Sequence, residues 1–236
     1  MLPVAILAGG LATRLRPATE KIPKSLLEVN GEPFIVHQLR LLKANGVSQV
    51  VLCVGFLGEM VREVVKNGRA FGLDVHYSFD GPALLGTAGA LKRALPALGH
   101  AFLTLYGDSY LLCDYEAVAR EFEESRKLAL MTVFRNEGQW DTSNVEFEDG
   151  RILAYNKKER TPRMKFIDYG LGAFAAHAFE RVPAEQAYDL ADLYTQILAD
   201  GELAGMEIKQ RFYEIGSPAG LEETARFIAT QGVGKA

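Results

Sequence analysis

Blocks of two kinds alternate along the first half of the chain. Short, almost continuous apolar runs predict buried strands at residues 3–8, 49–54, 74–78, 101–106 and 129–135. Stretches with apolar residues three or four positions apart predict amphipathic helices at residues 34–45, 59–67, 87–94 and 115–125. Thr87 is a candidate N-cap for the third of these helices. Strands that alternate with helices are typical of parallel βαβ units, so the pattern predicts a Rossmann-like α/β fold.

The second half of the chain has shorter predicted strands, separated by turn residues. They lie at residues 144–148, 151–156, 167–174 and 206–214, and helices are predicted at residues 187–199 and 219–230. No linker or internal repeat interrupts the sequence. We therefore expect one domain, residues 1–236, with a doubly wound, mostly parallel, mixed sheet and helices on both faces. Within it, we expect residues 136–236 to form a smaller, β-rich half that follows residues 1–135.

A glycine pair and a group of cations follow the first predicted strand. Gly9 and Gly10 end the apolar run, and Arg14 and Lys24 come shortly afterwards. Glycine lets backbone N–H groups approach a phosphate closely, while Arg offers a planar fork for its oxygens and Lys a point charge. The loop lacks both the Gly-Lys-Ser/Thr ending of a Walker motif and the glycine spacing of a dinucleotide fingerprint. It therefore predicts a phosphate site of another type.

A second polar feature follows the fourth predicted strand, where Gly107 and Asp108 end the apolar run. Ligands of open α/β sheets bind outside the carboxyl ends of the strands. The glycine pair and Asp108 are both expected at that edge of the sheet. No His/Asp or Ser/His arrangement suggests proton transfer or an activated serine, and the four histidines are dispersed.

Five segments of the chain carry a family resemblance. Residues 7–17 (LAGGLATRLRP) with residues 22–25 (IPKS) resemble the signature of the nucleoside-diphosphate-sugar pyrophosphorylases, the sugar-1-phosphate nucleotidyltransferases. Four further segments resemble motifs of that family in the same order: residues 85–91 (LGTAGAL), 106–109 (YGDS), 152–158 (ILAYNKK) and 212–218 (FYEIGSP). The chain shows no C-terminal hexapeptide repeats, and in this it is similar to the short, single-domain members.

The resemblance implies transfer of a nucleoside monophosphate from an NTP to a sugar 1-phosphate, with release of pyrophosphate and with Mg²⁺ as cofactor. A phosphate monoester is largely ionised near neutral pH, so no general base is needed. Residues 1–135 would bind the nucleotide and residues 136–236 the sugar phosphate. We favour GTP with a mannose- or heptose-type 1-phosphate. Two alternatives are CMP transfer to a phosphocholine- or phosphonate-like acceptor, and a non-catalytic module that senses nucleotide sugars.

The resemblance also implies roles for individual residues. Arg14 would bind the departing pyrophosphate, Lys24 the α-phosphate or the attacking phosphate, and Asp108 the metal ion together with Glu214. Nucleotide binding would fall to Leu7, Ala8, Gly9, Gly10, Asp80, Gly86 and Thr87. Sugar-phosphate binding would fall to Asn144, Lys158, Asp168 and Gly170.

The chain departs from the family pattern at three places. Ala12 stands where the loop has its third glycine, and Glu214 where the second metal ligand is aspartate. Residues 156–158 (NKK) replace a Glu-Glu-Lys segment. These departures affect the expected identity of the sugar more than the expected type of reaction. Trp140 and Asp141 lie in a polar loop that either lines the sugar site or packs beside it.

Composition limits the partners that we expect. The formal net charge of −4 disfavours nucleic acid and anionic membranes, which attract basic proteins. Cys53 and Cys113 lie in apolar runs and are expected to be buried, reduced thiols. The start of the chain lacks the basic region of a signal peptide, and no apolar run nears the ~20 residues of a membrane helix. We expect a cytoplasmic protein, and an apolar edge or helix face would support a homodimer.

Overall fold

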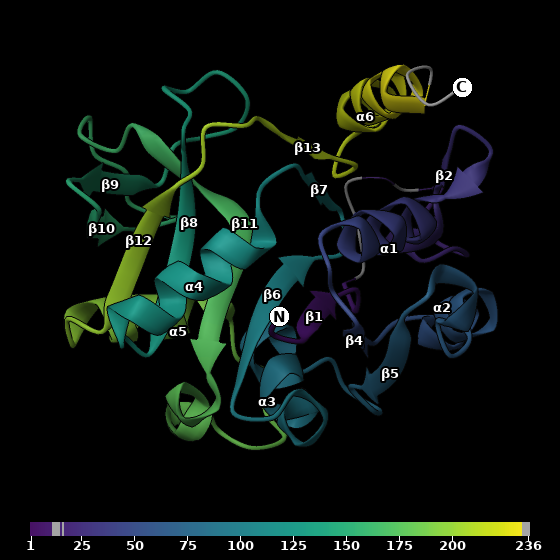
Figure 1. The fold of residues 1–236 in the computed structure, drawn as a ribbon, viewed down its shortest axis with the longest axis horizontal. Coiled ribbons are helices and arrows are strands. Elements are labelled where there is room, and N and C mark those ends of the chain that lie inside the picture. Colours follow the sequence, from purple (N-terminus) through teal and green to yellow (C-terminus); the bar gives the residue numbers. More distant parts are fainter. Residues whose placement is uncertain (11–14, 16, 233–236) are drawn as a thin grey trace.

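The computed structural model describes residues 1–10, 15 and 17–232. Its α-helices are α1 (Phe34–Ala44), α2 (Gly58–Val65), α3 (Gly86–Leu98), α4 (Tyr115–Ser125), α5 (Leu190–Ala199) and α6 (Pro218–Gly232). Its strands are β1 (Val4–Leu7), β2 (Glu28–Val29), β3 (Glu32–Pro33), β4 (Gln49–Val54), β5 (Asp74–Phe79), β6 (Ala101–Tyr106), β7 (Ser109–Leu111), β8 (Ala129–Arg135), β9 (Val145–Glu148), β10 (Arg151–Tyr155), β11 (Phe166–Ala175), β12 (Leu203–Glu207) and β13 (Phe212–Glu214). Figure 1 shows this α/β arrangement, and the expected fold class is confirmed.

Nine of the described strands form one mixed sheet (Figure 1). Strands β6, β1, β4 and β5 lie side by side in parallel, as the βαβ pattern predicts. On the other side of β6, β11 pairs antiparallel with both β6 and β8. Strands β9, β10 and β12 extend the sheet beyond them. The carboxyl ends of the four parallel strands therefore lie along one edge, next to the antiparallel part.

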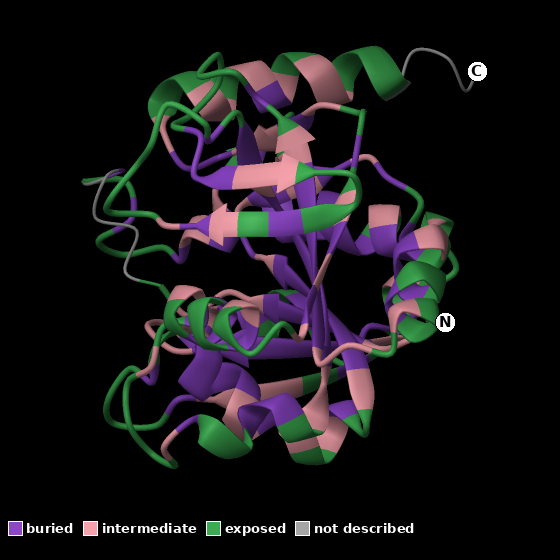
Figure 2. Ribbon diagram, turned by 90° about the vertical axis from the view of Figure 1, so that its left-hand side faces the viewer, coloured by how far each residue is buried: buried purple, intermediate pink, exposed green. Residues whose placement is uncertain are grey.

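Helices cover both faces of this sheet. Apolar side chains of α1, α2 and α4 pack with Val4 and Ile6 of β1 on one face. Side chains of α3 and α5 pack with Ala5 on the other face. The alternation along β1 is the two-residue period of a strand that is buried on both sides. Figure 2 shows the buried residues gathered along the sheet between the helices. Both cysteines are free and buried as expected, and burial raises the pKa of each thiol to about 12.

Three local features differ from the expectations. Residues 206–214 form two strands in separate sheets, because β12 pairs with β8 and β13 with β7. Thr87 does not cap its own helix. Its hydroxyl accepts a hydrogen bond from the Leu190 N–H at 2.7 Å, and thus adds to the capping of α5, whose N-cap is Asp189. Helix α3 continues past Pro96 to Leu98, whose side chain is buried in the core.

None of the described helices is long and apolar enough to cross a membrane.

Candidate active site

A cavity of about 240 Å³ opens at the carboxyl ends of the parallel strands. Its lining brings together all seven residues expected to bind the nucleotide, together with Lys24 and Asp108. The sequence analysis assigned no binding role to the other residues that line this cavity: Ser25, Cys53, Leu84, Ala90, Tyr106 and Gly107. Several of these follow or end strands that the hydrophobic pattern located, so their place at this edge of the sheet was predictable in outline.

Two glycines give this cavity its shape. A Cβ on Gly107 would lie 2.7 Å from the Leu7 carbonyl oxygen, so the turn after β6 packs directly on the end of β1. Gly86 has φ +66°, and a Cβ there would lie 2.7 Å from the Tyr188 carbonyl oxygen. The first residue of α3 therefore tolerates no side chain. Residues 86–89 meet the segment before α5 instead, where the Ala88 N–H donates to the same Tyr188 oxygen at 2.9 Å.

Asp80 follows β5 and places a carboxylate in the wall of the same cavity. Its side chain is 5% exposed, and its Oδ2 accepts a hydrogen bond from the Leu85 N–H at 3.2 Å. Arg93 of α3 donates to the Phe79 and Asp80 carbonyl oxygens at 2.9 and 2.8 Å. Burial raises the pKa of Asp80, while the Leu85 N–H and the Arg93 charge oppose the rise. The carboxylate is thus held firmly in a partly desolvated place.

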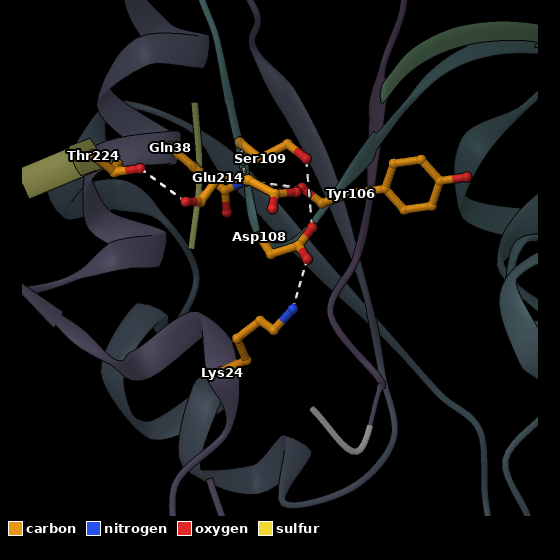
Figure 3. Close-up of polar contacts among 7 residues, drawn as sticks. All are labelled: Lys24, Gln38, Tyr106, Asp108, Ser109, Glu214 and Thr224. Carbon is orange, nitrogen blue, oxygen red and sulfur yellow. Dashed lines mark hydrogen bonds and ion pairs between the residues drawn. The ribbon is translucent and has the colours of Figure 1, made fainter. Parts of the chain in front are cut away.

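Lys24 and Asp108, which both line this cavity, form an ion pair. The Lys24 Nζ donates to Asp108 Oδ2 at 2.6 Å, and both side chains are about one fifth exposed, at 18% and 24%. Figure 3 shows the two side chains pointing toward each other. Lys24 begins a short 3-10 helix, Lys24–Leu26, that follows the Pro23 of the signature segment. Two residues 84 positions apart are thereby joined at one point.

A second cavity, of about 340 Å³, adjoins the first one. Tyr106 and Asp108 line both cavities. Four of the five other residues expected at the sugar and metal sites line the second one: Asn144, Asp168, Gly170 and Glu214. Its remaining lining is Ser109, Asp141, Thr142, Lys157, Arg160, Ile167, Tyr169 and Phe212. We refer to the two spaces as the nucleotide cavity and the acceptor cavity.

The pairing of β7 with β13 brings Glu214 to Asp108. Glu214 lies opposite Ser109 in this antiparallel pair, and the Ile215 N–H donates to the Asp108 carbonyl oxygen at 2.9 Å. Thr224 of α6, which is fully buried, donates to the Glu214 carbonyl oxygen at 3.0 Å. Figure 3 shows Glu214 extending beside Asp108 from the strand that Thr224 holds. Two carboxylates that lie 106 positions apart in the sequence thus face one cavity.

Comparison with known proteins agrees with this arrangement. A family model described as nucleotidyl transferase matches residues 4–231. The chain belongs to this family. Its curated relatives include sugar-1-phosphate nucleotidyltransferases with different nucleotides and sugars.

Three relatives illustrate this range. The chain is 28% identical over 213 residues to a UTP–glucose-1-phosphate uridylyltransferase of Synechocystis. This match covers 83% of the chain and 55% of the relative. The chain is 28% identical over 221 residues to mannose-1-phosphate guanyltransferase beta-B of Xenopus laevis, which covers 90% and 61%. It is 31% identical over 183 residues to a glucose-1-phosphate thymidylyltransferase of Streptomyces antibioticus, which covers 76% and 51%. The chain therefore spans between half and two thirds of the length of these relatives.

Solved structures share the fold of this family member. HddC from Yersinia pseudotuberculosis, complexed with GMP-PN, matches with a TM-score of 0.79 and 20% identity, covering 97% of this chain and 100% of that chain. A Bacillus anthracis protein described as a glucose-1-phosphate thymidylyltransferase, in complex with sucrose, matches with a TM-score of 0.84 and 22% identity, covering 96% and 95%. Both matches extend over nearly the whole chain, so the antiparallel half belongs to the shared fold.

The lysine that lines the acceptor cavity is not the one that the sequence of this nucleotidyl transferase suggested. Lys158 does not line the cavity, whereas Lys157 does. The Asn156 side chain accepts hydrogen bonds from the backbone N–H groups of Lys158 and Glu159 at 2.8 and 2.9 Å, which turns the chain at this point. The Lys157 Nζ lies 5.7 Å from the centre of the Tyr106 ring. The turn at Asn156 determines which of the two adjacent lysines faces the cavity. The sequence pattern alone therefore could not distinguish Lys157 from Lys158.

Asp168 lies at an irregular point of β11. The pairing of β11 with β8 shifts register between Asp168 and Gly172, and Gly170 has φ +99°. The Asp168 Oδ1 accepts from the Gly170 N–H at 3.0 Å, and its own N–H donates to the Asn144 Oδ1 at 3.0 Å. Burial raises the pKa of Asp168, and the Lys157 charge and the Gly170 N–H oppose this rise. The bulge thus turns a half-buried carboxylate toward the acceptor cavity. Arg14 and Ala12 lie outside the described residues.

Gln38 of α1 positions the turn that carries Asp108. Its side chain is 1% exposed, and its amide nitrogen donates to the carbonyl oxygens of Tyr106 and Ser109 at 3.0 and 2.7 Å (Figure 3). One amide therefore holds both ends of the turn between β6 and β7. Its effect is on the backbone, and through the backbone on the direction of the Asp108 carboxylate.

Gln38→Leu is expected to destabilise the protein by about 1–3 kcal/mol, because two buried carbonyl oxygens lose their donor. Because the Asp108 turn loosens, activity should also fall by more than the loss of folded protein explains. Gln49→Leu is the matched control, since the Gln49 amide donates to the Ala97 carbonyl oxygen at 2.9 Å, away from both cavities. Urea denaturation and kcat are the measurements. Equal kcat values in the two folded variants would contradict a positioning role for Gln38.

Proposed function

We propose that this chain transfers a nucleoside monophosphate from an NTP to a sugar 1-phosphate and releases pyrophosphate. One observation carries the proposal. The nucleotide cavity and the acceptor cavity share Asp108 and Tyr106, and the Lys24 ammonium lies 2.6 Å from the shared carboxylate. A site that joins two phosphates needs two adjoining pockets and positive charge where they meet. The curated relatives catalyse reactions of this class, as their names state.

The carboxylates at the junction fit the expected metal ion. Asp108 and Glu214 both line the acceptor cavity, and Asp108 also lines the nucleotide cavity. Mg²⁺ is usually held by one or two carboxylates and completes its shell with water and substrate phosphates. Among the described residues no group of three metal-binding side chains occurs, which agrees with a site that is completed by substrate. When bound, Mg²⁺ would neutralise charge on the reacting phosphates.

The chain itself supplies positioning and charge. Lys24 is the only cation among the described residues that line the nucleotide cavity, so it would approach the α-phosphate or the attacking phosphate. Lys157 and Arg160 line the acceptor cavity and suit the phosphate of the sugar. Asn144, Asp141 and Asp168 offer oxygen acceptors for sugar hydroxyls. Since the acceptor phosphate is already ionised near pH 7, no residue has to remove a proton.

Asp80 supports guanine as the base. Asp80 follows β5 and Asp108 follows β6, and three strand steps of 4.7–4.9 Å separate these strands by about 14 Å. That span leaves room for a nucleoside between a base at Asp80 and phosphates at Asp108. A carboxylate accepts hydrogen bonds from the two donors that guanine presents side by side, N1–H and the exocyclic amine, whereas uracil and thymine present one donor between two carbonyls. We therefore favour GTP, with a mannose- or heptose-type 1-phosphate.

The test is a panel assay. The protein is incubated with Mg²⁺, each of GTP, UTP, CTP and dTTP, and each of mannose, glucose and heptose 1-phosphates or phosphocholine, and pyrophosphate release is followed. We expect the highest kcat/KM with GTP and a mannose- or heptose-type acceptor. Release only with CTP and phosphocholine would favour the alternative transferase. Binding of NTP without release in any combination would favour a sensing module.

Asp80→Asn is expected to lower kcat/KM for GTP by roughly 10- to 100-fold, since a hydrogen bond to a charged acceptor is replaced by one to a neutral amide that also presents a donor. The kcat/KM for UTP should change little, so the preference for GTP over UTP, measured as the ratio of the two kcat/KM values, becomes smaller. Asp74→Asn is the matched control, because Asp74 is exposed at the opposite end of the same strand. An equal loss with both nucleotides would show that Asp80 only supports the fold of the loop.

A further inference from the structure

Residues 137–143 follow β8 and contribute to the lining of the acceptor cavity, and we call them the acceptor loop. Asp141 and Thr142 of this loop line the cavity, and Asn144 follows directly. The loop is held from inside by Asn136, which is 1% exposed. The Asn136 amide nitrogen donates to the Asp141 carbonyl oxygen at 2.6 Å, and its oxygen accepts from the Trp140 N–H at 3.2 Å. These bonds hold the backbone of the loop at Trp140 and Asp141, but they do not hold the Trp140 side chain.

The outer side of the loop rests on a stack that begins with Trp140. The Arg211 guanidinium carbon lies 3.4 Å from the centre of the Trp140 ring and 4.9 Å from the centre of the Tyr213 ring. The Tyr213 ring stacks on Phe227 of α6 at 3.9 Å with an interplanar angle of 17°. Trp140, Arg211, Tyr213 and Phe227 thus form a continuous column from the acceptor loop to α6, which we call the arginine stack.

The orientation of the guanidinium is fixed from the side. Two nitrogens of Arg211 donate to the two carboxylate oxygens of Glu223 at 2.8 and 2.6 Å, a bidentate pair from α6. This pair lowers the pKa of Glu223 and keeps it charged. A guanidinium held in its own plane by a carboxylate presents its flat face to an aromatic ring. Trp140 is nevertheless 46% exposed, so packing in the core does not explain its position.

The arginine stack connects the two sides of the acceptor cavity. Arg211 and Tyr213 flank Phe212, and Tyr213 immediately precedes Glu214. Both Phe212 and Glu214 line the cavity. Trp140 immediately precedes Asp141 and Thr142, which line it as well. The ring of Trp140 therefore fixes the distance between the acceptor loop and the strand that carries one of the two carboxylates.

We propose that Trp140 is a positioning residue for the sugar phosphate: stacked on Arg211, it holds Asp141 and Thr142 where they contact the acceptor. This inference rests on the proposed function, because it takes the second cavity as the acceptor site. Trp140 does not itself line either cavity, so it acts through its neighbours. Its role concerns the acceptor and leaves nucleotide binding unaffected.

Steady-state kinetics with Trp140→Ala and Trp140→Phe test the inference. We expect Trp140→Ala to raise the KM for the sugar 1-phosphate about tenfold, in keeping with the loss of one well-ordered cation–π contact, with a KM for the NTP within twofold of wild type. Trp140→Phe keeps a ring over Arg211 and should restore most of the acceptor affinity. Val64→Ala is the matched control, because it also shortens a partly exposed apolar side chain, 40% exposed, on the distant helix α2. An unchanged acceptor KM in Trp140→Ala, or equal rises in both KM values, would overturn the inference.

Fluorescence gives a readout that does not depend on turnover. Trp140 is the single tryptophan of the chain, so the intrinsic tryptophan emission reports on the stack alone. Titration with mannose 1-phosphate or glucose 1-phosphate, without NTP, should change the emission in a saturable way, whereas titration with inorganic phosphate over the same range should not. Identical responses to sugar phosphate and phosphate would count against the inference. Absence of pyrophosphate release from the wild-type protein in every combination would contradict the proposed function itself.

Discussion

Asp108→Asn is expected to lower kcat about 1,000-fold, the loss that corresponds to several kcal/mol of charge stabilisation at the reacting phosphates. Asp108 lines both cavities and bonds Lys24 at 2.6 Å, so no other described carboxylate takes part in both halves of the site. Asparagine keeps the size of the side chain and an acceptor for Lys24, but it removes the charge that would hold Mg²⁺. Pyrophosphate release at saturating NTP, measured as Mg²⁺ is varied, is the appropriate assay.

The Asp108→Asn variant should remain folded, because asparagine keeps the shape of the side chain and an oxygen acceptor for the Lys24 ammonium, and both side chains still reach solvent. Asp192→Asn on the exposed side of α5 is the matched control and should keep wild-type kcat. If Asp108→Asn retained more than a tenth of the wild-type kcat while melting at the same temperature, the placement of the reaction at the junction of the two cavities would be wrong.

Lys24→Ala is expected to lower kcat by roughly 100- to 1,000-fold, the range seen when one preorganised donor is removed from an active site. Lys24 is the only cation among the described residues that line the nucleotide cavity, and the substitution removes it. The Asp108 carboxylate then loses its ion-pair partner in that cavity. Because both effects act on the reacting phosphates, the loss should appear mainly in kcat. Single-turnover pyrophosphate release separates this loss from any change in NTP binding.

Lys24→Arg distinguishes charge from geometry. It keeps the positive charge but replaces a compact ammonium by a planar fork, so we expect an intermediate rate. Lys43→Ala, at the exposed end of α1, is the control for loss of a surface cation. A Lys24→Ala variant that differs from wild type only in the KM for NTP would mean that Lys24 binds the nucleotide without taking part in the transfer.

The hydrophobic pattern predicted the long strands of the first half of the chain because each of them is a local feature. Residues 49–54, 101–106 and 129–135 are continuous apolar runs that end at polar residues or glycine, and they became β4, β6 and β8 without a shift. Burial on both faces leaves such runs almost no polar position, so their ends are clear. Asp108 and the glycine pair were located for the same reason, since each follows one of these strands.

The antiparallel half was less predictable, because pairing partners far away in the sequence decide its strands. Strand β7 has three residues, too few to show a period, and it exists through its pairing with β13, about a hundred residues later. The same pairing separates residues 212–214 from β12 and brings Glu214 to Asp108. The hydroxyl of Thr87 likewise bonds a helix that begins at residue 190. Such contacts depend on the assembled fold and leave no local signal.

The position of β11 bears on how proteins of this kind acquire new substrates. Strand β11 comes from the second half of the chain but lies between β6 and β8 of the first half, with Phe174 opposite Phe102 on one side and Ala129 on the other. A fragment that ended at residue 135 would leave the edges of both strands open. Recombination that exchanged whole halves between relatives would have to match two interfaces along β11 at once. Changes in short surface segments such as the acceptor loop avoid this constraint, so new sugar preferences are expected to arise there.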